Sequence, residues 1–261
     1  GLWQIYHREI PDFLQDFSAT PPLKRLQQVG MNCGCEYTAF PRFATVAPYS
    51  RFTHSMGVAL IVWHFTGDMR QSVAGLLHDV ATPAFSHVVD FLHGDHLRQE
   101  STEAKTAAWI ADSPQLQSLL ARYGLNAEEV ADYHRYPIAD NPSPRLSADR
   151  LEYTLGNLLG YGFSDLSQVR SFYQDLTIWE DPAGTPELAF RSPEVAESFT
   201  EAALQTARVY VAQEDRFAMQ ALADLLANAL DRGVLSETDL WETEPHVISK
   251  LLGDEDCAAR W

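Results

Sequence analysis

Apolar residues recur at helical spacing through most of the chain. In residues 21–30, for example, Leu23, Leu26 and Val29 share one side of a segment that starts with two prolines and stops at Gly30. Apolar residues fill most of 51–65, which predicts a buried helix. The same reasoning predicts helices over the following segments: 21–30, 51–65, about 71–79, about 98–122, 127–135 and 146–160.

The C-terminal third has the same helical pattern. Two long helices are expected after residue 192, with Ser192 as the N-cap and Pro193 in the first turn, and two short ones in the tail. Residues 137–144 and 179–187 are rich in proline and polar residues, and the second segment is either a short strand pair or an exposed connection. We therefore expect an all-α fold in one domain over 1–261, with core motifs at about 20–165 and C-terminal helices at about 190–252.

Composition and charge narrow the class of protein. The 261 residues are 46% hydrophobic and 11% aromatic, which is typical of a globular chain. The net charge of −17 argues against long nucleic acid as a partner, and the apolar runs are too short to cross a membrane. Three cysteines form no disulfide framework, so a reduced, cytoplasmic protein is expected.

Four polar residues stand out because they interrupt apolar segments. His78 and Asp79 are adjacent in "AGLLHDVATPAFSH", His54 lies in "SRFTHSMGVAL", and Asp149 lies in "SADRLEYTL". Buried imidazoles and carboxylates need a hydrogen bond, an acid–base partner or a metal ion. Divalent Mn, Fe, Co, Ni and Zn accept both ligand types. Taken singly, a buried histidine is more often a hydrogen-bonded core residue, and Ser147 or Asp149 can serve as a helix N-cap.

The motifs "RFTHSMGV", "AGLLHDVATPAFSH" and "ADRLEYTL", in this order, resemble the HD superfamily of metal-dependent phosphohydrolases. The nearest likeness is to the deoxynucleoside triphosphate triphosphohydrolase branch. It starts at "PPLKRLQQVG", continues through "ARVYVAQEDRFAMQALADLLANAL" and covers about residues 20–250. The resemblance implies a helical bundle with a metal site in its core. One divalent ion (Mn, Fe, Ni, Co or Zn) would be held by four ligands: His54, His78, Asp79 and Asp149.

The resemblance also implies roles for residues around the metal. Substrate contacts are expected from five of them: Arg51 and His87 at the phosphate, and Gln28, Tyr153 and Asn157 at the sugar. Asp79 is expected to orient the attacking water, and His96, oriented by Asp90, to protonate the leaving group, with His93 as the alternative. Without the resemblance, Arg51 is a salt-bridged helix-start residue, Gln28 an ordinary polar residue and Tyr153 a core aromatic.

Two departures from the branch bear on the substrate. Thr82 replaces a third family histidine, between Ala81 and Pro83 where the family has glycines, and Asn157 replaces an aspartate. We therefore expect a metal-dependent phosphohydrolase that acts on a phosphate ester of a nucleotide or another small metabolite, rather than a true triphosphohydrolase. The alternatives are a catalytically weak regulatory module that binds metal or nucleotide, and a metal that is purely structural. Related proteins often form dimers, so a homodimer is the assembly to consider.

Overall fold

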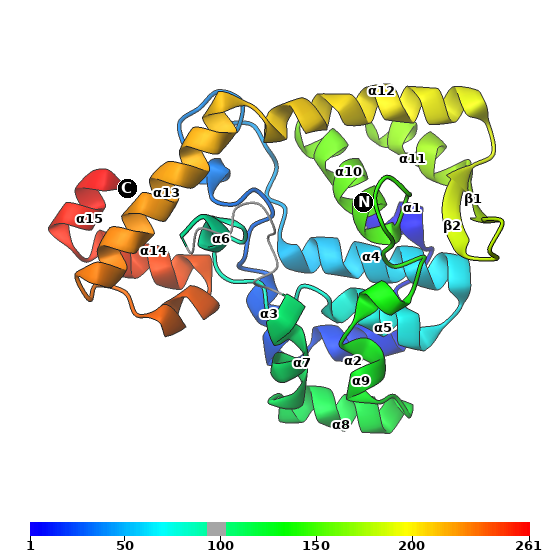
Figure 1. The fold of residues 1–261 in the computed structure, drawn as a ribbon, viewed down its shortest axis with the longest axis horizontal. Coiled ribbons are helices and arrows are strands. Elements are labelled where there is room, and N and C mark those ends of the chain that lie inside the picture. The colour runs from blue at the N-terminus through cyan, green and yellow to red at the C-terminus, as the bar shows by residue number, and fades with distance from the viewer. Residues whose placement is uncertain (93–102) are drawn as a thin grey trace.

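The computed structural model describes residues 1–92 and 103–261, apart from the side chains of Asp90, Phe91, Glu103 and Ala104. Helices dominate the described residues, and the single sheet among them is one antiparallel hairpin (Figure 1). The prediction of an all-α fold is thereby confirmed. In the same ranges, no helix combines the length and the apolar composition needed to cross a membrane.

The elements follow one another in three groups. Before residue 93 they are α1 (Trp3–Tyr6), α2 (Asp12–Ser18), α3 (Pro21–Leu26), η1 (Cys35–Tyr37), α4 (Arg51–Thr66), α5 (Met69–Leu77) and α6 (Val88–Leu92). The middle group is α7 (Glu103–Ala111), α8 (Pro114–Tyr123), α9 (Ala127–Val130), η2 (Tyr133–Arg135), α10 (Ala148–Gly160), α11 (Leu166–Gln174), β1 (Leu176–Glu180) and β2 (Pro186–Phe190). The last group is α12 (Pro193–Tyr210), α13 (Gln213–Asp231), η3 (Glu237–Trp241), α14 (Glu244–Leu252) and α15 (Glu255–Arg260).

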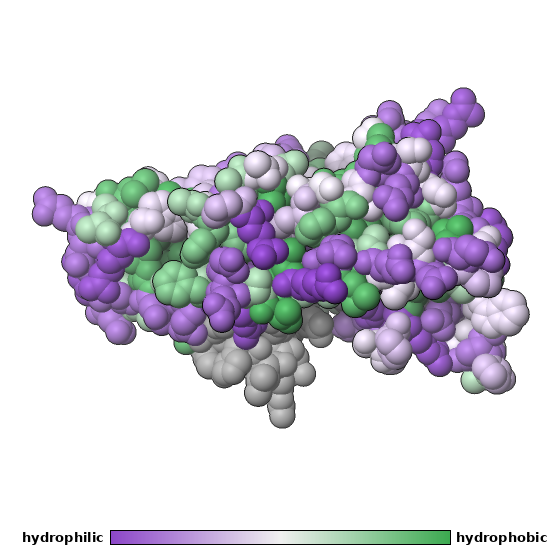
Figure 2. Space-filling model, turned by 90° about the horizontal axis from the view of Figure 1, so that it is seen from above, coloured by the Kyte–Doolittle hydropathy of each residue, from purple (hydrophilic) through white to green (hydrophobic). Residues whose placement is uncertain are grey.

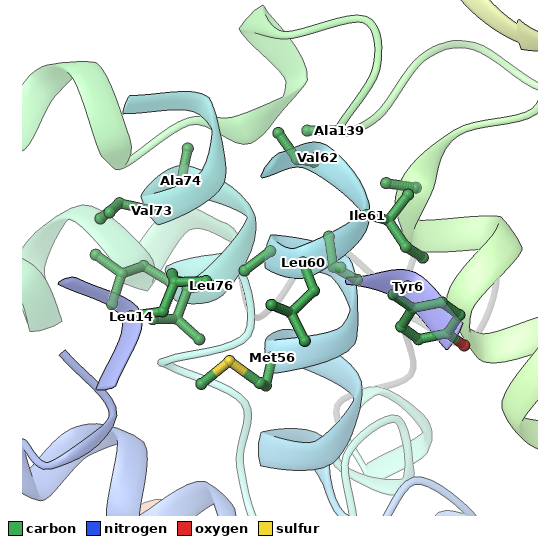
Figure 3. Close-up of a cluster of buried hydrophobic side chains, with 14 of the residues drawn as sticks. Tyr6, Leu14, Met56, Leu60, Ile61, Val62, Val73, Ala74, Leu76 and Ala139 are labelled. Atoms are coloured by element: carbon green, nitrogen blue, oxygen red, sulfur yellow. The ribbon is translucent and has the colours of Figure 1, made fainter. Parts of the chain in front are cut away.

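A first hydrophobic core is centred on α4 and α5. Leu60 of α4 faces Leu76 of α5, and Tyr6 of α1 lies beside α4 (Figure 3). The two helices pack closely at Gly75, where a Cβ atom would lie 3.1 Å from Cγ1 of Val58. Because α4 is buried along most of its length, the polar residues at its start are held in a rigid setting.

Truncation of this core has a predictable cost. Leu60 has no exposed area, so Leu60→Ala should lower the free energy of unfolding by about 2–5 kcal/mol, through lost burial and a cavity. Leu204 on α12 is 52% exposed and provides the control. Leu204→Ala should change the free energy of unfolding by less than about 0.5 kcal/mol. Urea denaturation monitored by circular dichroism measures both. Equal losses in the two variants would contradict this placement of the core.

A second hydrophobic core lies toward the C-terminus. It is built mainly from α6, α13, α14 and the end of α12, together with residues of the 33–43 segment. In Figure 1, α12 runs along the top of the molecule from the hairpin to α13, and α13 leads to the C-terminal helices. Seen from above, the molecule presents a largely hydrophilic surface, with hydrophobic residues exposed between the hydrophilic ones (Figure 2). The assignment of one domain over 1–261 stays a prediction.

Several helix boundaries differ from those predicted. α3 stops at Leu26 rather than Gly30. Of the helix predicted over 98–122, residues 98–102 lie outside the described residues, and the rest contains a break before Pro114, where Ser113 caps α8. The segment around 179–187 forms the turn and part of the strands of the β1–β2 hairpin, in which Leu176 pairs with Phe190. The sequence analysis missed five α-helices: α1, α2, α6, α11 and α15.

Candidate metal centre

The start of α4 brings Arg51 and His54 to one face of the helix, one turn apart. The helix begins there because Ser50 has extended backbone and its hydroxyl accepts a hydrogen bond from the N–H of Thr53 at 3.2 Å. Both side chains are buried, although one is a cation and the other an imidazole. Their polar atoms therefore need partners inside the protein.

His78 and Asp79 lie in the turn that follows α5. His78 keeps helical backbone angles, and its Nδ1 lies 2.7 Å from the carbonyl oxygen of Gly75. A carbonyl oxygen can only accept a hydrogen bond, so Nδ1 carries the hydrogen. In the neutral ring, Nε2 then offers its lone pair to the interior of the site.

Asp149 lies in the first turn of α10. Ser147 caps this helix by accepting from the N–H of Arg150 at 3.3 Å, so the Asp149 side chain is not used as the cap. The Tyr133 hydroxyl donates to Oδ2 of Asp149 at 3.2 Å, and the Tyr133 ring packs on the ring of His78 with centroids 4.7 Å apart. Tyr133 thus orients two of the predicted ligands at once.

His54, His78 and Asp149 converge from three separate parts of the chain. Nε2 of His54 lies 3.0 Å from Oδ1 of Asp149, and Nε2 of His78 lies 3.9 Å from the same oxygen. One ligand atom from each residue lies within 4.8 Å of the others. Two imidazole nitrogens and a carboxylate oxygen suit a divalent transition metal, and three protein ligands leave room for water and substrate.

Asp79, the fourth predicted ligand, lies at the edge of this group. Its Oδ2 accepts from Nη1 of Arg51 at 3.1 Å and lies 3.6 Å from Nε2 of His78. Its Oδ1 accepts from the Thr82 hydroxyl at 2.9 Å. Nε of Arg51 donates to the Ser86 hydroxyl at 3.0 Å. The buried Asp79 charge is therefore compensated by Arg51, next to the three converging ligands.

The electrostatics of the centre follow from these contacts. Burial alone would lower the pKa of His54, but its hydrogen bonds to Asp149 and Glu152 raise that pKa to about 10. Burial would raise the pKa of Asp149, but the hydrogen bond from His54 and the nearby imidazole charges lower it to about 2. Burial would raise the pKa of Asp79, but the charge of Arg51, the charges of the two nearby imidazoles and the hydrogen bond from Arg51 together hold it far below its ordinary value. Metal binding at His54 therefore requires loss of its Nε2 proton.

The converging residues open into a pocket of about 430 Å³. Four of the five residues predicted to contact substrate line it: Arg51, His87, Tyr153 and Asn157. The amide of Asn157 donates to the Tyr210 hydroxyl at 2.7 Å. The described lining also includes residues that the sequence analysis did not single out: Tyr133, Tyr161, Tyr210 and Asp215. The pocket therefore joins the α4–α10 face to the α12–α13 junction.

Other predicted residues are placed differently. Gln28 is exposed and is not among the described residues of the pocket lining. It lies after the end of α3, where its carbonyl oxygen accepts from the N–H of Glu244 at 3.1 Å. The structure thus does not bring the Gln28 side chain to the site. The prediction for the proton donor lies outside the described residues, since these include neither His96, nor its alternative His93, nor the side chain of Asp90.

Glu152 is a site residue that the sequence analysis missed. It has no exposed area, and its Oε2 lies 2.6 Å from Nδ1 of His54. The available signal was its position three residues after Asp149, on the same face of the helix. A carboxylate at that spacing from a predicted ligand was a candidate for the same site.

The chain is similar to several known proteins. No family model matches the chain. It is 29% identical over 204 residues to the Uncharacterized protein YdhJ of Bacillus subtilis, and the match covers 77% of this chain and 61% of the relative. It is 26% identical over 161 residues to the metal-dependent phosphohydrolase cns2 of Cordyceps militaris, or 61% of this chain and 45% of the relative. It is also 29% identical over 126 residues to the deoxynucleoside triphosphate triphosphohydrolase SAMHD1 homolog of Dictyostelium discoideum, or 41% of this chain and 24% of the relative.

The matched region spans less than two thirds of the length of each of these relatives. Within it, two relatives carry names that agree with the likeness seen in the motifs. The chain is thus related to the HD-domain metal-dependent phosphohydrolases, on the side of the SAMHD1-like proteins, and this confirms the resemblance.

Proposed function

We propose that this relative of the HD-domain phosphohydrolases hydrolyses a phosphate ester of a small metabolite, using a water activated by one divalent metal ion. The observation that carries the proposal is the convergence of His54, His78 and Asp149 at the wall of a pocket. A buried arginine beside the same ligands supports it, because guanidinium groups recognise phosphate oxygens.

Each site residue has a role that fits the chemistry of its side chain. His54, His78 and Asp149 would hold the ion, with Asp79 beside them. A divalent ion bound there supplies Lewis acidity toward a phosphoryl oxygen and lowers the pKa of a water molecule. Arg51 faces the same pocket and supplies positive charge for the phosphate. We assign the orientation of the attacking water to Asp79, and its fixed position between Arg51 and Thr82 supports this role.

The charges in the pocket favour a substrate with little negative charge. Among the described lining residues, the permanent cations are two arginines, Arg51 and Arg216, and they stand against three aspartates, Asp79, Asp149 and Asp215. A divalent ion held by the ligands would add two positive charges, and the resulting small net charge suits one phosphate group better than a triphosphate. Thr82, which replaces the third family histidine, is buried and bonded to Asp79, so it offers the substrate no cationic group. We therefore favour a phosphate monoester, such as a nucleoside monophosphate, over a triphosphate.

Among the organic groups that can carry the phosphate, the pocket suits a nucleoside best. Tyr153, Tyr161 and Tyr210 line it and offer aromatic surface for a base or sugar. Two similar proteins, the Dictyostelium relative and SAMHD1 of Gallus gallus, are named deoxynucleoside triphosphate triphosphohydrolases, which supports a nucleotide.

Product analysis tests the proposal. Metal-reconstituted protein is incubated with nucleoside mono-, di- and triphosphates and with sugar phosphates, and ion chromatography separates orthophosphate from tripolyphosphate. We expect orthophosphate from monophosphates, and no such product from Asp79→Ala. Tripolyphosphate from deoxynucleoside triphosphates would overturn the preference for monoesters. Full metal content and full turnover in Asp79→Ala would overturn the role of that residue.

A regulatory module is the second candidate function, and Thr82 and Asn157 favour it. Thr82 replaces a family histidine, and the Asn157 amide is already engaged with Tyr210. Nucleotide binding without turnover would raise the melting temperature with ligand concentration while releasing no product. Thermal denaturation with and without nucleotide, run beside the product assay, separates the two functions.

Asp215 provides a test of substrate specificity. Burial raises its pKa to about 6, and its Oδ1 lies 3.7 Å from the Cys35 thiol. A partly buried carboxylate favours substrates that offer it an N–H or O–H donor. Asp215→Asn should therefore raise KM for adenosine monophosphate about 10–100-fold with little change in kcat, because a hydrogen bond to a charged group contributes about 1.5–3 kcal/mol.

Purine riboside monophosphate, which lacks the exocyclic amino group, is the matched substrate for this test. Its KM should change little in Asp215→Asn. Equal changes in KM for both substrates would show that Asp215 does not recognise the amino group.

A further inference from the structure

We infer that Glu152 is a positioning residue that fixes the ring and the tautomer of His54 for metal binding. The inference rests on the proposed metal site and goes beyond it, because the ligand set itself does not include Glu152. It is carried by a buried hydrogen-bonded chain that leads from the centre to two tyrosines.

The two nitrogens of His54 face different carboxylates. Nδ1 lies 2.6 Å from Oε2 of Glu152, and Nε2 lies 3.0 Å from Oδ1 of Asp149. An ionised carboxylate only accepts hydrogen bonds, so Glu152 keeps a hydrogen on Nδ1. Nε2 is then the nitrogen that binds a cation. A carboxylate on the outer nitrogen also makes the imidazole a stronger ligand.

Glu152 is itself held by two hydroxyl groups. The Tyr49 hydroxyl donates to Oε2, and the Tyr6 hydroxyl donates to Oε1 at 3.3 Å. Tyr6 comes from α1 and Tyr49 from the loop before α4, so three distant segments meet at this carboxylate. Since Glu152 has no exposed area, these bonds and the one to His54 replace its contacts with water.

The backbone leaves space for this chain of contacts. At Gly57 of α4, an added Cβ atom would lie 2.5 Å from Oε1 of Glu152. At Gly156 of α10, it would lie 2.5 Å from the Tyr49 hydroxyl oxygen. Both glycines stand where any larger side chain would push the carboxylate or its tyrosine partner away. A buried carboxylate is a costly way to fill a core, and the His54 ring is the group that it serves.

Metal binding by the purified chain tests the role of Glu152. Glu152→Gln keeps the shape but removes the charge, and its affinity for Co²⁺ should fall about 10–100-fold, with a changed visible absorption spectrum of the bound ion. Asp239→Asn is the matched control. Asp239 is also a buried carboxylate that bonds a histidine, with His246 Nε2 at 2.7 Å, but it lies in the second core. We expect this control to bind Co²⁺ as the wild type does.

A second variant covers the case in which Glu152→Gln does not fold. Tyr49→Phe removes one hydroxyl from the chain of contacts, so it should weaken Co²⁺ binding several-fold and shift the spectrum in the same direction. Unchanged Co²⁺ affinity and spectrum in either folded variant would overturn the inference. A wild-type chain that binds no Co²⁺ overturns both the metal site and the inference. Wild-type binding without hydrolysis of any phosphate ester overturns only the proposed function.

Discussion

Asp149→Asn should lose the bound metal and reduce turnover by roughly a thousandfold or more. Both Nε2 atoms of the centre face Oδ1 of Asp149, so this single oxygen completes the donor set. Asparagine keeps the shape but presents a neutral oxygen. Removal of one preorganised electrostatic contact already costs about 10²–10³ in kcat, and loss of the ion removes its other contributions as well.

Metal content by elemental analysis and orthophosphate release measure this effect. Circular dichroism establishes that the variant is folded. Glu201→Gln removes an exposed carboxylate from α12 and should match the wild type in both measurements. An Asp149→Asn variant with full metal content and full turnover would rule out Asp149 as a ligand.

Arg51→Met should destabilise the metal-free chain by about 3–5 kcal/mol, because it leaves the Asp79 charge buried without its cation. The ion pair is 3.1 Å long, and both residues are buried. Methionine fills a similar length of space, so the loss of charge dominates over any cavity. Urea denaturation near neutral pH measures the change. Arg51→Lys keeps the charge but not the planar set of donors to Asp79 and Ser86, so it should cost less.

The dependence on pH has a definite sign. Arg51 holds the pKa of Asp79 below its ordinary value, so the stabilisation is present above that value, 3.8, and is lost as the pH falls. The difference between wild type and Arg51→Met should therefore be largest near neutral pH and should narrow toward acid. A difference that stays constant down to the carboxyl range would show that Arg51 stabilises the fold through packing instead.

The helices that carry the site were predictable because their starts are determined locally. Ser50 and Ser147 cap α4 and α10, and apolar runs follow both serines. Local signals were overlooked elsewhere. Leu166, Val169 and Phe172 have helical spacing behind the Asp165 cap, yet α11 was not predicted. The Ser113–Pro114 pair that separates α7 from α8 was also a readable helix start.

Contacts that join distant segments set the limit of prediction for the site. The order of the motifs brought His54, His78 and Asp149 together as candidates, and the structure places them side by side. The bond from His54 to Glu152 spans 98 residues, and only the position of Glu152 one turn after Asp149 pointed to it. Gln28 was misplaced for a related reason. The direction of the Gln28 side chain depends on where α3 ends. The helix ends at Leu26, two residues before Gln28, whereas the prediction continued it to Gly30.

The pocket draws its walls from both hydrophobic cores. His54 and Tyr153 belong to helices of the first core, whereas Asp215 and Met219 belong to α13 of the second. A ligand that touches both walls binds only when both cores are folded, so its binding free energy adds to the cooperativity between them. Occupancy of the pocket should therefore slow hydrogen exchange in the helices of both cores, including those that do not touch the ligand.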